Sequence, residues 1–555
     1  MSKIFKKAAI FALALVLAIP MAAGSSAAPY IPPTMTMKIG LHYNTKTLDG
    51  ANLQNVSGMG SGFEFGYYDA DRNFHSLGVT TSENKISMVI DKNVVYRDGN
   101  YYEGTSGNVV VGCFHVNLGT YPDYDSARRA ASGYTGGFVK YIGTGFCAMA
   151  GNYTTREEAA SAAASIGGYV DSGTSSTVAV VVTGTNTILF EYSDAATYLA
   201  VRPLQSGMQK PQTWFKGYKY YGAFQYSRLS GGKLTVVNFV DIEDYTKGVV
   251  PYEMSASWPI EAQKAQAVCA RTYAIANLNK HRAYGFDICN TTDCQVYHGT
   301  NSATALSDSA IEETAGKYMT MNGKLCTAYY MSCDGGATED SENVWLVAEG
   351  YLRGKQDPYE ADIANSVSGY YWTKTYSGSE LAAKIGASGK IVTVMLVLTK
   401  NGNVYSVKLT DSTGKTHTFT KDKARTKLGL NSLHYTLAKA GSGSSAGAGG
   451  VYVNSGSDKL SSALSDAYAV GSSGVEILGS DKVYAISGKG TVSEVDGVGG
   501  GESVLMYSGD TFTFSGSGSG HNVGMSQWGA YSMAKYHNKS YIDILTFYYT
   551  GVEIG

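Results

Sequence analysis

An internal near-repeat places the strongest constraint on the fold of this chain. The segments "CFHVNLGTYPDYDSARRAA" (113–131) and "GFCAMAGNYTTREEAASAA" (145–163) each combine a strand pattern, a Gly, an aromatic residue, a turn and a short Ala-rich helix. The strand patterns "STVAVVVTG" and "TILFEYS" follow them. Two such strand–helix units in tandem predict a small α/β module, which we assign to residues 110–198.

Further domains are expected around this module, because a chain of 555 residues is too long for one hydrophobic core. Residues 36–109 form a β-rich segment, and strand patterns resume at residue 218. Residues 441–503 begin with "GSGSSAGAGG" and indicate a flexible linker and an insertion. We therefore predict an α+β fold with one discontinuous domain, formed by residues 218–440 and 504–555.

The first 28 residues have the pattern of an export signal. Lys3, Lys6 and Lys7 precede an apolar run over residues 8–19, and small residues follow at 22–28, as in a cleavable signal peptide. The apolar run is shorter than the about 20 residues that a membrane-spanning helix needs. The alternative to cleavage is that the signal is kept as a membrane anchor. We expect a secreted or cell-envelope protein with no stable membrane span after signal cleavage.

Charge and cysteine content exclude two further classes. The chain has 44 basic and 46 acidic residues, so it lacks the basic footprint of a nucleic-acid-binding protein. Its seven cysteines are too few and too scattered for a disulfide framework. Cys289–Cys294 and Cys326–Cys333 could still form local pairs in an oxidising compartment.

Two segments carry candidate chemistry. In "GVVPYEMSASWPIEAQKAQAVCARTYAIANL" (248–278), Glu253 occupies a turn marked by Pro and aromatic residues, and Lys264 and Arg271 follow on one face of an Ala-rich helix. Capping of this helix is the structural alternative for Glu253. In "GSGSGHNVGMSQWGA" (516–530), Gly residues surround His521 and allow a ligand to approach the backbone closely.

These segments, together with "CQVYHG", "YYMSCDGGATEDSENVW" and "YIDILTFYYTG", resemble the stage II sporulation protein D family (SpoIID/LytB) over residues 218–440 and 504–555. The resemblance implies an exported envelope protein. Active members of the family are lytic transglycosylases that cleave peptidoglycan glycan strands lacking stem peptides. The family's catalytic glutamate corresponds to Glu253, and its cleft Lys and Arg correspond to Lys264 and Arg271.

A single carboxyl group suffices for this reaction. Hydrolytic glycosidases need two, whereas in a lytic transglycosylase the 6-hydroxyl of the sugar attacks, and one group can act first as acid and then as base. Such an acid needs a raised pKa, and we expect Tyr252, Met254 and Trp258 to desolvate Glu253. The two helix cations would lower that pKa on contact, so we assign them to substrate hydroxyl and acetamido groups or to fixing the loop.

Further substrate contacts are predicted on the opposite wall of the cleft, at Gln295, Tyr297, His521, Ser526 and Gln527. The family usually has Gly after this His, whereas Asn522 stands here. Asn is the least costly replacement where φ is positive, so we expect the loop to keep its conformation.

Two resemblances concern binding. The near-repeat of residues 110–198 resembles the SPOR domain, a βαββαβ module of bacterial envelope proteins that binds peptide-free glycan strands. Some members of the stage II sporulation protein D family bind zinc through two Cys and two His, and Cys289 and Cys294 resemble the two thiolates. Matching His ligands are not evident, so a disulfide is an equal alternative. No other cofactor is expected.

The sequence thus predicts a peptidoglycan lytic transglycosylase in cell-wall remodelling or sporulation. The first alternative is a non-enzymatic glycan-binding protein that activates a cell-wall amidase, and the second is a generic adhesin or surface protein. A desolvated Glu253 in an open cleft favours the enzyme, and a blocked cleft favours the activator. Failure of Glu253 to converge with the His521 loop favours the surface protein.

Overall fold

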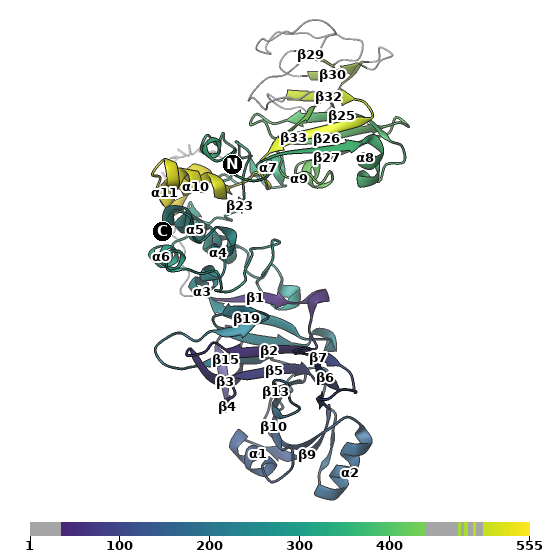
Figure 1. Ribbon diagram of the computed structural model, residues 1–555, viewed down its shortest axis with the longest axis vertical. Helices are drawn as coiled ribbons and strands as arrows, with labels where there is room; N and C mark the ends of the chain where they lie inside the picture. The colour runs from purple at the N-terminus through teal and green to yellow at the C-terminus, as the bar shows by residue number, and fades with distance from the viewer. Residues whose placement is uncertain (1–34, 439–474, 479–481, 487–491, 495–502) are drawn as a thin grey trace, which may run out of the picture.

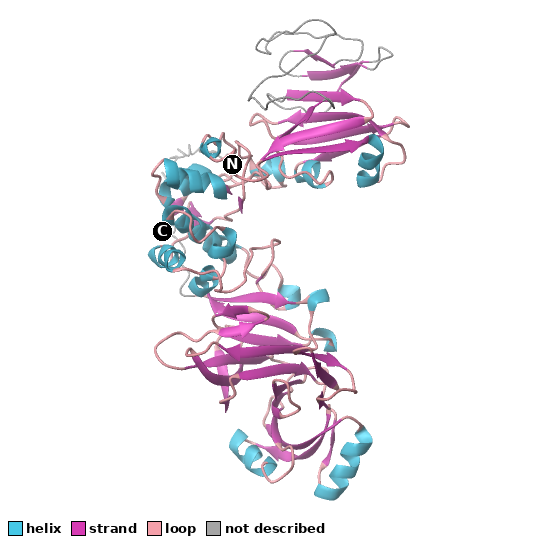
Figure 2. Cartoon of the chain, viewed as in Figure 1, coloured by secondary structure: helices cyan, strands magenta, loops and turns pink. Residues whose placement is uncertain are grey.

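The computed structural model describes residues 35–438, 475–478, 482–486, 492–494 and 503–555, so the predicted signal peptide and most of the predicted insertion lie outside the described residues. The chain is elongated: a two-helix module lies at one end, followed by two large sheets, a helical layer and a second group of sheets (Figure 1). Strands dominate both large β-rich parts, and helices gather between them and at the module (Figure 2). The fold is α+β.

A seven-stranded sheet joins the start of the described chain to the middle. Its order is β20 (Ile288–Cys289), β1 (Thr36–His42), β19 (Thr235–Asp241), β18 (Ala223–Ser227), β15 (Leu199–Gln205), β3 (Gly60–Tyr68) and β4 (Phe74–Thr81). β1 runs antiparallel to β19 and parallel to β20. Three strands of the segment 36–109, β1, β3 and β4, therefore lie in the same sheet as β18 to β20, and the segment does not stand alone.

One glycine permits this sheet to pack. A Cβ at Gly40 on β1 would lie 2.3 Å from the ring of Phe286, so a larger residue would displace the aromatic ring that covers the strand. Phe286 is buried in a small cluster with Phe239 and Cys289, which ties the sheet to the loop that follows helix α5 (Ile260–Ala276).

A ten-stranded sheet contains the near-repeat. Its order is β12 (Tyr169–Asp171), β9 (Phe114–Tyr121), β11 (Phe146–Tyr153), β10 (Phe138–Tyr141), β14 (Ile188–Tyr192), β13 (Val178–Val182), β5 (Lys85–Ile90), β2 (Gly50–Asn55), β16 (Thr213–Phe215) and β17 (Tyr218–Tyr220). A small sheet of β7 (Asn100–Glu103), β6 (Val94–Arg97) and β8 (Val110–Val111) lies beside it.

The near-repeat itself forms β9-α1-β10-β11-α2-β12, a βαββαβ unit whose neighbouring strands are antiparallel. Asp123 is the N-cap of helix α1 (Tyr124–Ala131). Helix α2 (Arg156–Ile166) is preceded by the N-cap Thr155, which forms a capping box with Glu158. The helices bury Ala side chains only, which lets them approach the sheet closely. β10 continues the sheet into β14, so the unit is built into the body of the protein.

The helical layer holds α3 (Ile242–Lys247), α4 (Val250–Glu253), α5 (Ile260–Ala276), α6 (Ala305–Glu313), α7 (Ser341–Val344), α10 (Gln527–Tyr536) and α11 (Tyr541–Tyr548). Helix α5 is buried over most of its length, because its run of small residues admits neighbours on every side. Two small sheets connect the C-terminal part of the chain to residues 319–331. One contains β22 (Lys324–Leu325), β21 (Met319–Met321) and β35 (Glu553–Ile554). The other pairs β23 (Tyr330–Met331) with β34 (Met525–Ser526).

The second β-rich part carries two sheets that combine residues from both sides of the predicted insertion. One is β24 (Tyr371–Ser377), β33 (Thr511–Ser517) and β28 (Tyr435–Ala438); the other is β27 (Thr416–Thr420), β26 (Val404–Asp411), β25 (Ile391–Leu398) and β32 (Ser503–Ser508). Helices α8 (Gly378–Ile385) and α9 (Asp422–Thr426) flank them, and β29 (Val475–Leu478), β30 (Lys482–Ile486) and β31 (Val492–Glu494) form a further sheet.

A search of the described helices for one both long enough and apolar enough to span a bilayer finds none.

Candidate active site

Glu253 is the last residue of the short helix α4, which has Pro251 in its first turn and ends at the extended backbone of Met254. Its side chain is partly exposed. Oε1 accepts a hydrogen bond from the backbone N–H of Val296 at 2.8 Å, and Oε2 accepts one from Nε2 of Gln527 at 3.3 Å. Three segments that are distant in the sequence thus meet at one carboxyl group.

Burial raises the pKa of Glu253 above its ordinary value. The hydrogen bonds from Val296 and Gln527, and a contribution from Tyr330, oppose the rise without cancelling it. The expected direction of the shift is therefore confirmed. Trp258 packs on Trp528, with ring centroids 4.4 Å apart, in the loop between α4 and α5. The expectation that Tyr252, Met254 and Trp258 desolvate Glu253 stays a prediction.

Gln527 is positioned by the start of helix α10. Ser526 is the N-cap of α10: its hydroxyl accepts the N–H of Gly529 and donates to Glu360. Ser526 also pairs with Met331 through the parallel strands β23 and β34. Ser526 is fully buried, so its role is to orient Gln527. The prediction that Ser526 contacts substrate is corrected accordingly.

Gln295 and Tyr297 support the site from below. Gln295 is 1 % exposed, donates to the hydroxyl of Tyr245 and to a backbone carbonyl, and accepts from the hydroxyl of Tyr330. Tyr297 is equally buried and donates to Asn238. Both side chains are therefore used internally on either side of Val296, and the prediction that they contact substrate is corrected.

The two cations of helix α5 also have internal partners. Arg271 is fully buried, and its guanidinium lies 2.7 Å from the carboxylate of Glu243. Lys264 lies 2.7 Å from Glu261 and 2.8 Å from Glu313. The spacing of the two cations on one helical face was read correctly, but the face packs on α3 and α6. For Arg271 this overturns the predicted substrate contact, and for Lys264 it leaves the loop-fixing alternative.

The His521 loop meets Glu253 through Gln527 rather than through the imidazole. His521 packs against Trp345 with ring centroids 5.1 Å apart, and its Nδ1 accepts the N–H of Val523. Burial lowers the pKa of His521 to about 4, so the ring is neutral at ordinary pH. Its predicted substrate contact remains a prediction.

Asn522 has φ +63°, the positive φ at which Asn is the least costly residue after Gly, so the expected loop conformation is confirmed. Its side chain donates to the backbone carbonyls of Asp334 and Ala337 and accepts the N–H of Leu433. The side-chain amide, which Gly lacks, thus holds the loop against the segments that carry Asp334, Ala337 and Leu433.

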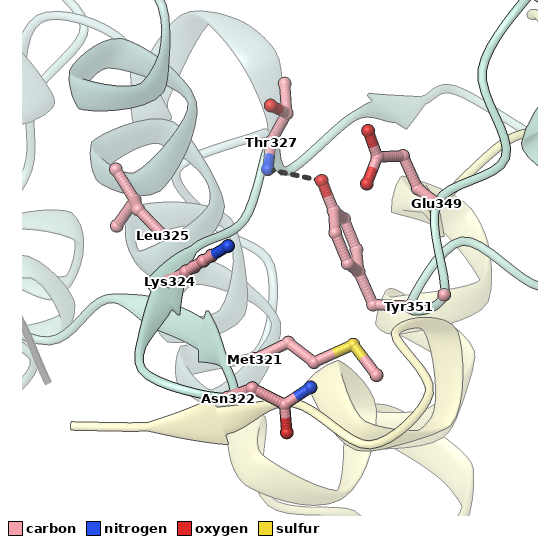
Figure 3. A pocket seen from close by; sticks show the side chains of 8 residues that line it. Met321, Asn322, Lys324, Leu325, Thr327, Glu349 and Tyr351 are labelled. Carbon is pink, nitrogen blue, oxygen red and sulfur yellow. Dashed lines mark hydrogen bonds between the residues drawn. The ribbon is translucent and has the colours of Figure 1, made fainter. Parts of the chain in front are cut away.

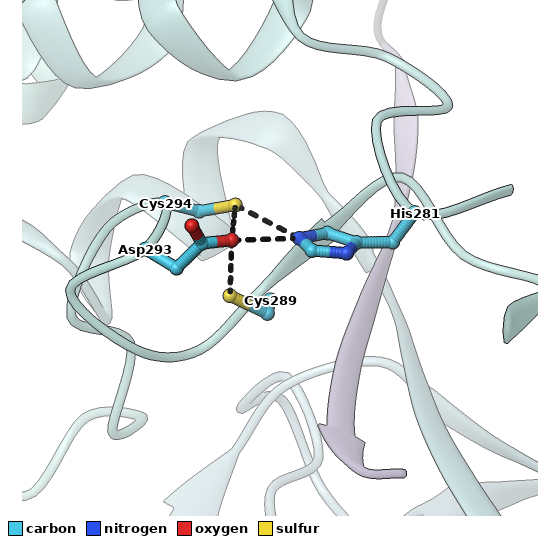
Figure 4. A group of neighbouring side chains, drawn as sticks. All are labelled: His281, Cys289, Asp293 and Cys294. Carbon is cyan, nitrogen blue, oxygen red and sulfur yellow. Dashed lines mark hydrogen bonds and ion pairs between the residues drawn. The ribbon is translucent and has the colours of Figure 1, made fainter. Parts of the chain in front are cut away.

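A group of possible metal ligands lies beside the loop that carries Val296. The side chains of His281, Cys289, Asp293 and Cys294 converge, with their ligand atoms within 4.8 Å of one another (Figure 4). His281 Nε2 is 3.3 Å from Cys294 Sγ and 3.2 Å from Asp293 Oδ2. Two sulfurs, one imidazole nitrogen and one carboxylate oxygen form a donor set that suits Zn²⁺.

The sequence did not identify His281 as a ligand, because a tight turn ending at Gly285 folds it back beside Cys289. All seven cysteines are free. The alternative disulfides Cys289–Cys294 and Cys326–Cys333 are therefore not formed in the structure.

A separate cavity of about 340 Å³ lies near the hairpin of β21 and β22 (Figure 3). Tyr351 crosses it, and its hydroxyl accepts the N–H of Thr327 at 2.9 Å. The lining residues are Met321, Asn322, Lys324, Leu325, Thr327, Glu349, Gly350 and Tyr351. None of them is a predicted site residue or a hydrogen-bond partner of Glu253, so we assign this cavity no part in the site.

The structure defines an α+β protein in which Glu253, a partly exposed carboxyl group with a raised pKa, joins three distant segments. Residues 230–321 match the family model described as Stage II sporulation protein. The chain is 31 % identical over 348 residues to an uncharacterized protein of Brachyspira hyodysenteriae, covering 61 % of this chain and 73 % of that protein. It belongs to the stage II sporulation protein D family.

Two further relatives are proteins of Bacillus subtilis. The amidase enhancer is 32 % identical over 321 residues, which cover 56 % of this chain and 40 % of the enhancer. Stage II sporulation protein D is 26 % identical over 334 residues, which cover 58 % of this chain and 76 % of that protein. These similarities support a role related to sporulation or the cell wall.

Proposed function

We propose that this protein is a lytic transglycosylase that cleaves peptidoglycan glycan strands without stem peptides at the cell envelope, with Glu253 as the acid and then the base. The observation that carries the proposal is the state of Glu253: a partly exposed carboxyl group whose pKa is raised by burial and which no Lys or Arg of the described residues pairs with.

The reaction follows from one carboxyl group. The protonated Glu253 donates its proton to the glycosidic oxygen, and the bond from that oxygen to the anomeric carbon breaks. The 6-hydroxyl of the same sugar then attacks the anomeric carbon, and the carboxylate accepts the hydroxyl proton, so that an anhydro ring forms without consumption of water. The N–H of Val296 and the amide of Gln527 stabilise the carboxylate between the two steps.

Glu253→Gln tests the proposal, with Glu312→Gln as the matched control because Glu312 is a mostly exposed carboxylate on the nearby helix α6. Purified glycan strands, intact and amidase-treated, are digested and the products are identified by mass spectrometry. We expect anhydro-muramyl ends from the wild type and from Glu312→Gln on treated strands, and none from Glu253→Gln. Equal cleavage by all three proteins, or by none, would refute the catalytic role.

Activation of a cell-wall amidase is the second candidate, because the amidase enhancer of Bacillus subtilis is 32 % identical to this chain. In this case wild type and Glu253→Gln bind the strands, leave them uncut and accelerate an added amidase equally. Loss of amidase stimulation in Glu253→Gln would argue against a purely non-enzymatic role.

We further propose that His281, Cys289, Asp293 and Cys294 hold Zn²⁺. The ion would act as a structural cross-link for the loop 289–296, whose Val296 N–H bonds Glu253. Metal analysis of the purified chain and of Cys294→Ser tests this, with a fall in both zinc content and melting temperature expected for the variant. A variant with unchanged zinc content would exclude Cys294 as a ligand.

The βαββαβ unit of residues 114–171 supports a SPOR-like role in glycan binding. Tyr169 is a candidate contact, because it is 59 % exposed on the edge strand β12 and tyrosine faces stack well on sugar rings. In the full chain, Tyr169→Ala should weaken the binding of long strands and leave the cleavage of short ones unchanged. Unchanged binding of long strands would remove Tyr169 from that surface.

A further inference from the structure

A second group of metal-ligating side chains lies far from Glu253, at the junction between the βαββαβ unit and the rest of the ten-stranded sheet. Asp91 directly follows β5, His115 lies on β9 and Glu191 lies on β14. Their ligand atoms are all within 4.8 Å of one another. These strands are not neighbours in the sheet, so the curvature of the sheet brings the three side chains together.

The group is buried and incompletely satisfied. His115 is 1 % exposed and Glu191 is fully buried, whereas Asp91 keeps partial exposure and marks a route of entry. The atoms that face one another, Asp91 Oδ2, His115 Nε2 and both carboxylate oxygens of Glu191, have no aligned hydrogen-bond partner. Unsatisfied buried oxygen and nitrogen atoms of this kind point to a missing ligand.

The orientation of His115 is that of a metal ligand. Its Nδ1 lies 3.0 Å from the carbonyl oxygen of Gly151. Since a carbonyl only accepts, Nδ1 carries a hydrogen, and Nε2 is the nitrogen that faces the two carboxyl groups. Nε2 is 3.0 Å from Glu191 Oε1. A buried contact between Nε2 and a carboxylate at this distance is held either by a proton on Nε2 or by a bound cation, and ring N–H bonds to backbone carbonyls commonly orient metal-bound His.

The neighbouring charges are compatible with a divalent ion. Lys140 lies 2.8 Å from Asp171 and 3.8 Å from Glu191, so the first carboxylate neutralises most of its charge. Arg228, the other nearby cation, donates to the backbone carbonyls of residues 174, 177, 231 and 232. Neither cation forms an ion pair with Asp91, so a divalent ion would give Asp91 and Glu191 a shared cationic partner.

We propose that Asp91, His115 and Glu191 bind a divalent transition-metal ion that fastens the βαββαβ unit to the body of the protein. One imidazole nitrogen and two carboxylates form a donor set of borderline hardness, for which Zn²⁺ is the appropriate probe. The proposal is independent of the proposed enzymatic activity and of the cysteine-containing group near Glu253.

The test uses the full chain carrying Cys289→Ser and Cys294→Ser, so that the other candidate site does not contribute. The protein is freed of metal with a chelator and titrated with Zn²⁺ by calorimetry, with metal content measured after dialysis. We expect about one Zn²⁺ per chain. Adding Asp91→Asn should weaken the affinity at least about 10-fold, because even indirect ligand partners contribute that much, whereas Asp98→Asn, at an 88 % exposed carboxylate, should not.

Each outcome decides the proposal. Asp91→Asn preserves the size of a partly exposed side chain and so should fold, and Glu191→Gln provides a second variant of equal size. Weaker Zn²⁺ binding in both, with an unchanged Asp98→Asn, supports the site. Two results overturn the proposal: no stoichiometric Zn²⁺ binding by the chain that carries only the two Cys→Ser changes, or equal affinity in all variants. Either result assigns the group to a shared-proton network between His115 and the two carboxyl groups.

Discussion

Replacing Arg271 with Met tests whether its guanidinium supports the fold or binds substrate. Nε and Nη2 lie 2.9 and 2.7 Å from Glu243 Oε2, and Nη2 lies 3.0 Å from the carbonyl oxygen of Ile311. Removing one partner of a buried ion pair costs about 3–5 kcal/mol. Glu243 retains 25 % exposure and can regain water, and Met fills the space of the Arg stem, so we expect the lower end, about 3 kcal/mol.

The assay is urea unfolding followed by tryptophan fluorescence, together with glycan binding by the folded protein. The free energy of unfolding falls by about 1–3 kcal/mol per molar urea, so the midpoint of the transition should fall by about 1–3 M. Arg128→Met is the matched control, because Arg128 is 60 % exposed and its pair with Asp125 contributes little. An Arg271→Met protein with an unchanged midpoint and lost glycan binding would refute the structural role and restore substrate contact.

Two further predictions concern the loop that reaches Glu253. Gln527→Leu removes a hydrogen bond that lowers the pKa of Glu253, so this pKa should rise further and the alkaline fall in cleavage rate should move to higher pH; a pH–rate profile with an unmoved limb would contradict the assignment. Asn522→Gly accepts φ +63° but loses the side-chain hydrogen bonds, at about 1–3 kcal/mol, and Asn522→Val should cost more because it adds backbone strain. Thermal melting ranks the two variants, and a Val variant as stable as the Gly variant would show that the backbone relaxes.

Local patterns predicted the local structure well. The small residues of 260–276 formed a buried helix, the near-repeat formed a βαββαβ unit, and Asn522 took the positive φ expected from its place in the motif. Each of these depends on interactions within a few residues, and those interactions leave a pattern in the sequence. Glu253 was singled out in the same way, as a carboxylate in a marked turn, and its catalytic role stays a prediction.

Long-range partners could not be predicted. Spacing showed that Lys264 and Arg271 share a helical face, but only the packed structure shows that Glu243 and Glu313 cover that face. The same holds for β1, whose partner strand begins about two hundred residues later, since any apolar strand of similar length has the same pattern. His281 was missed because its turn brings it to the thiolates from outside the motif.

Gln527 lies 274 residues beyond Glu253 in the sequence, and this separation determines when the surroundings of Glu253 are completed. A ribosome makes the chain from the N-terminus, and domains fold as they emerge. Helices α4 and α5 can pack before β34 and α10 exist, but the carboxyl group of Glu253 then lacks one of its two donors. The hydrogen-bonded surroundings of Glu253 are therefore complete only after residues 525–536 have been made.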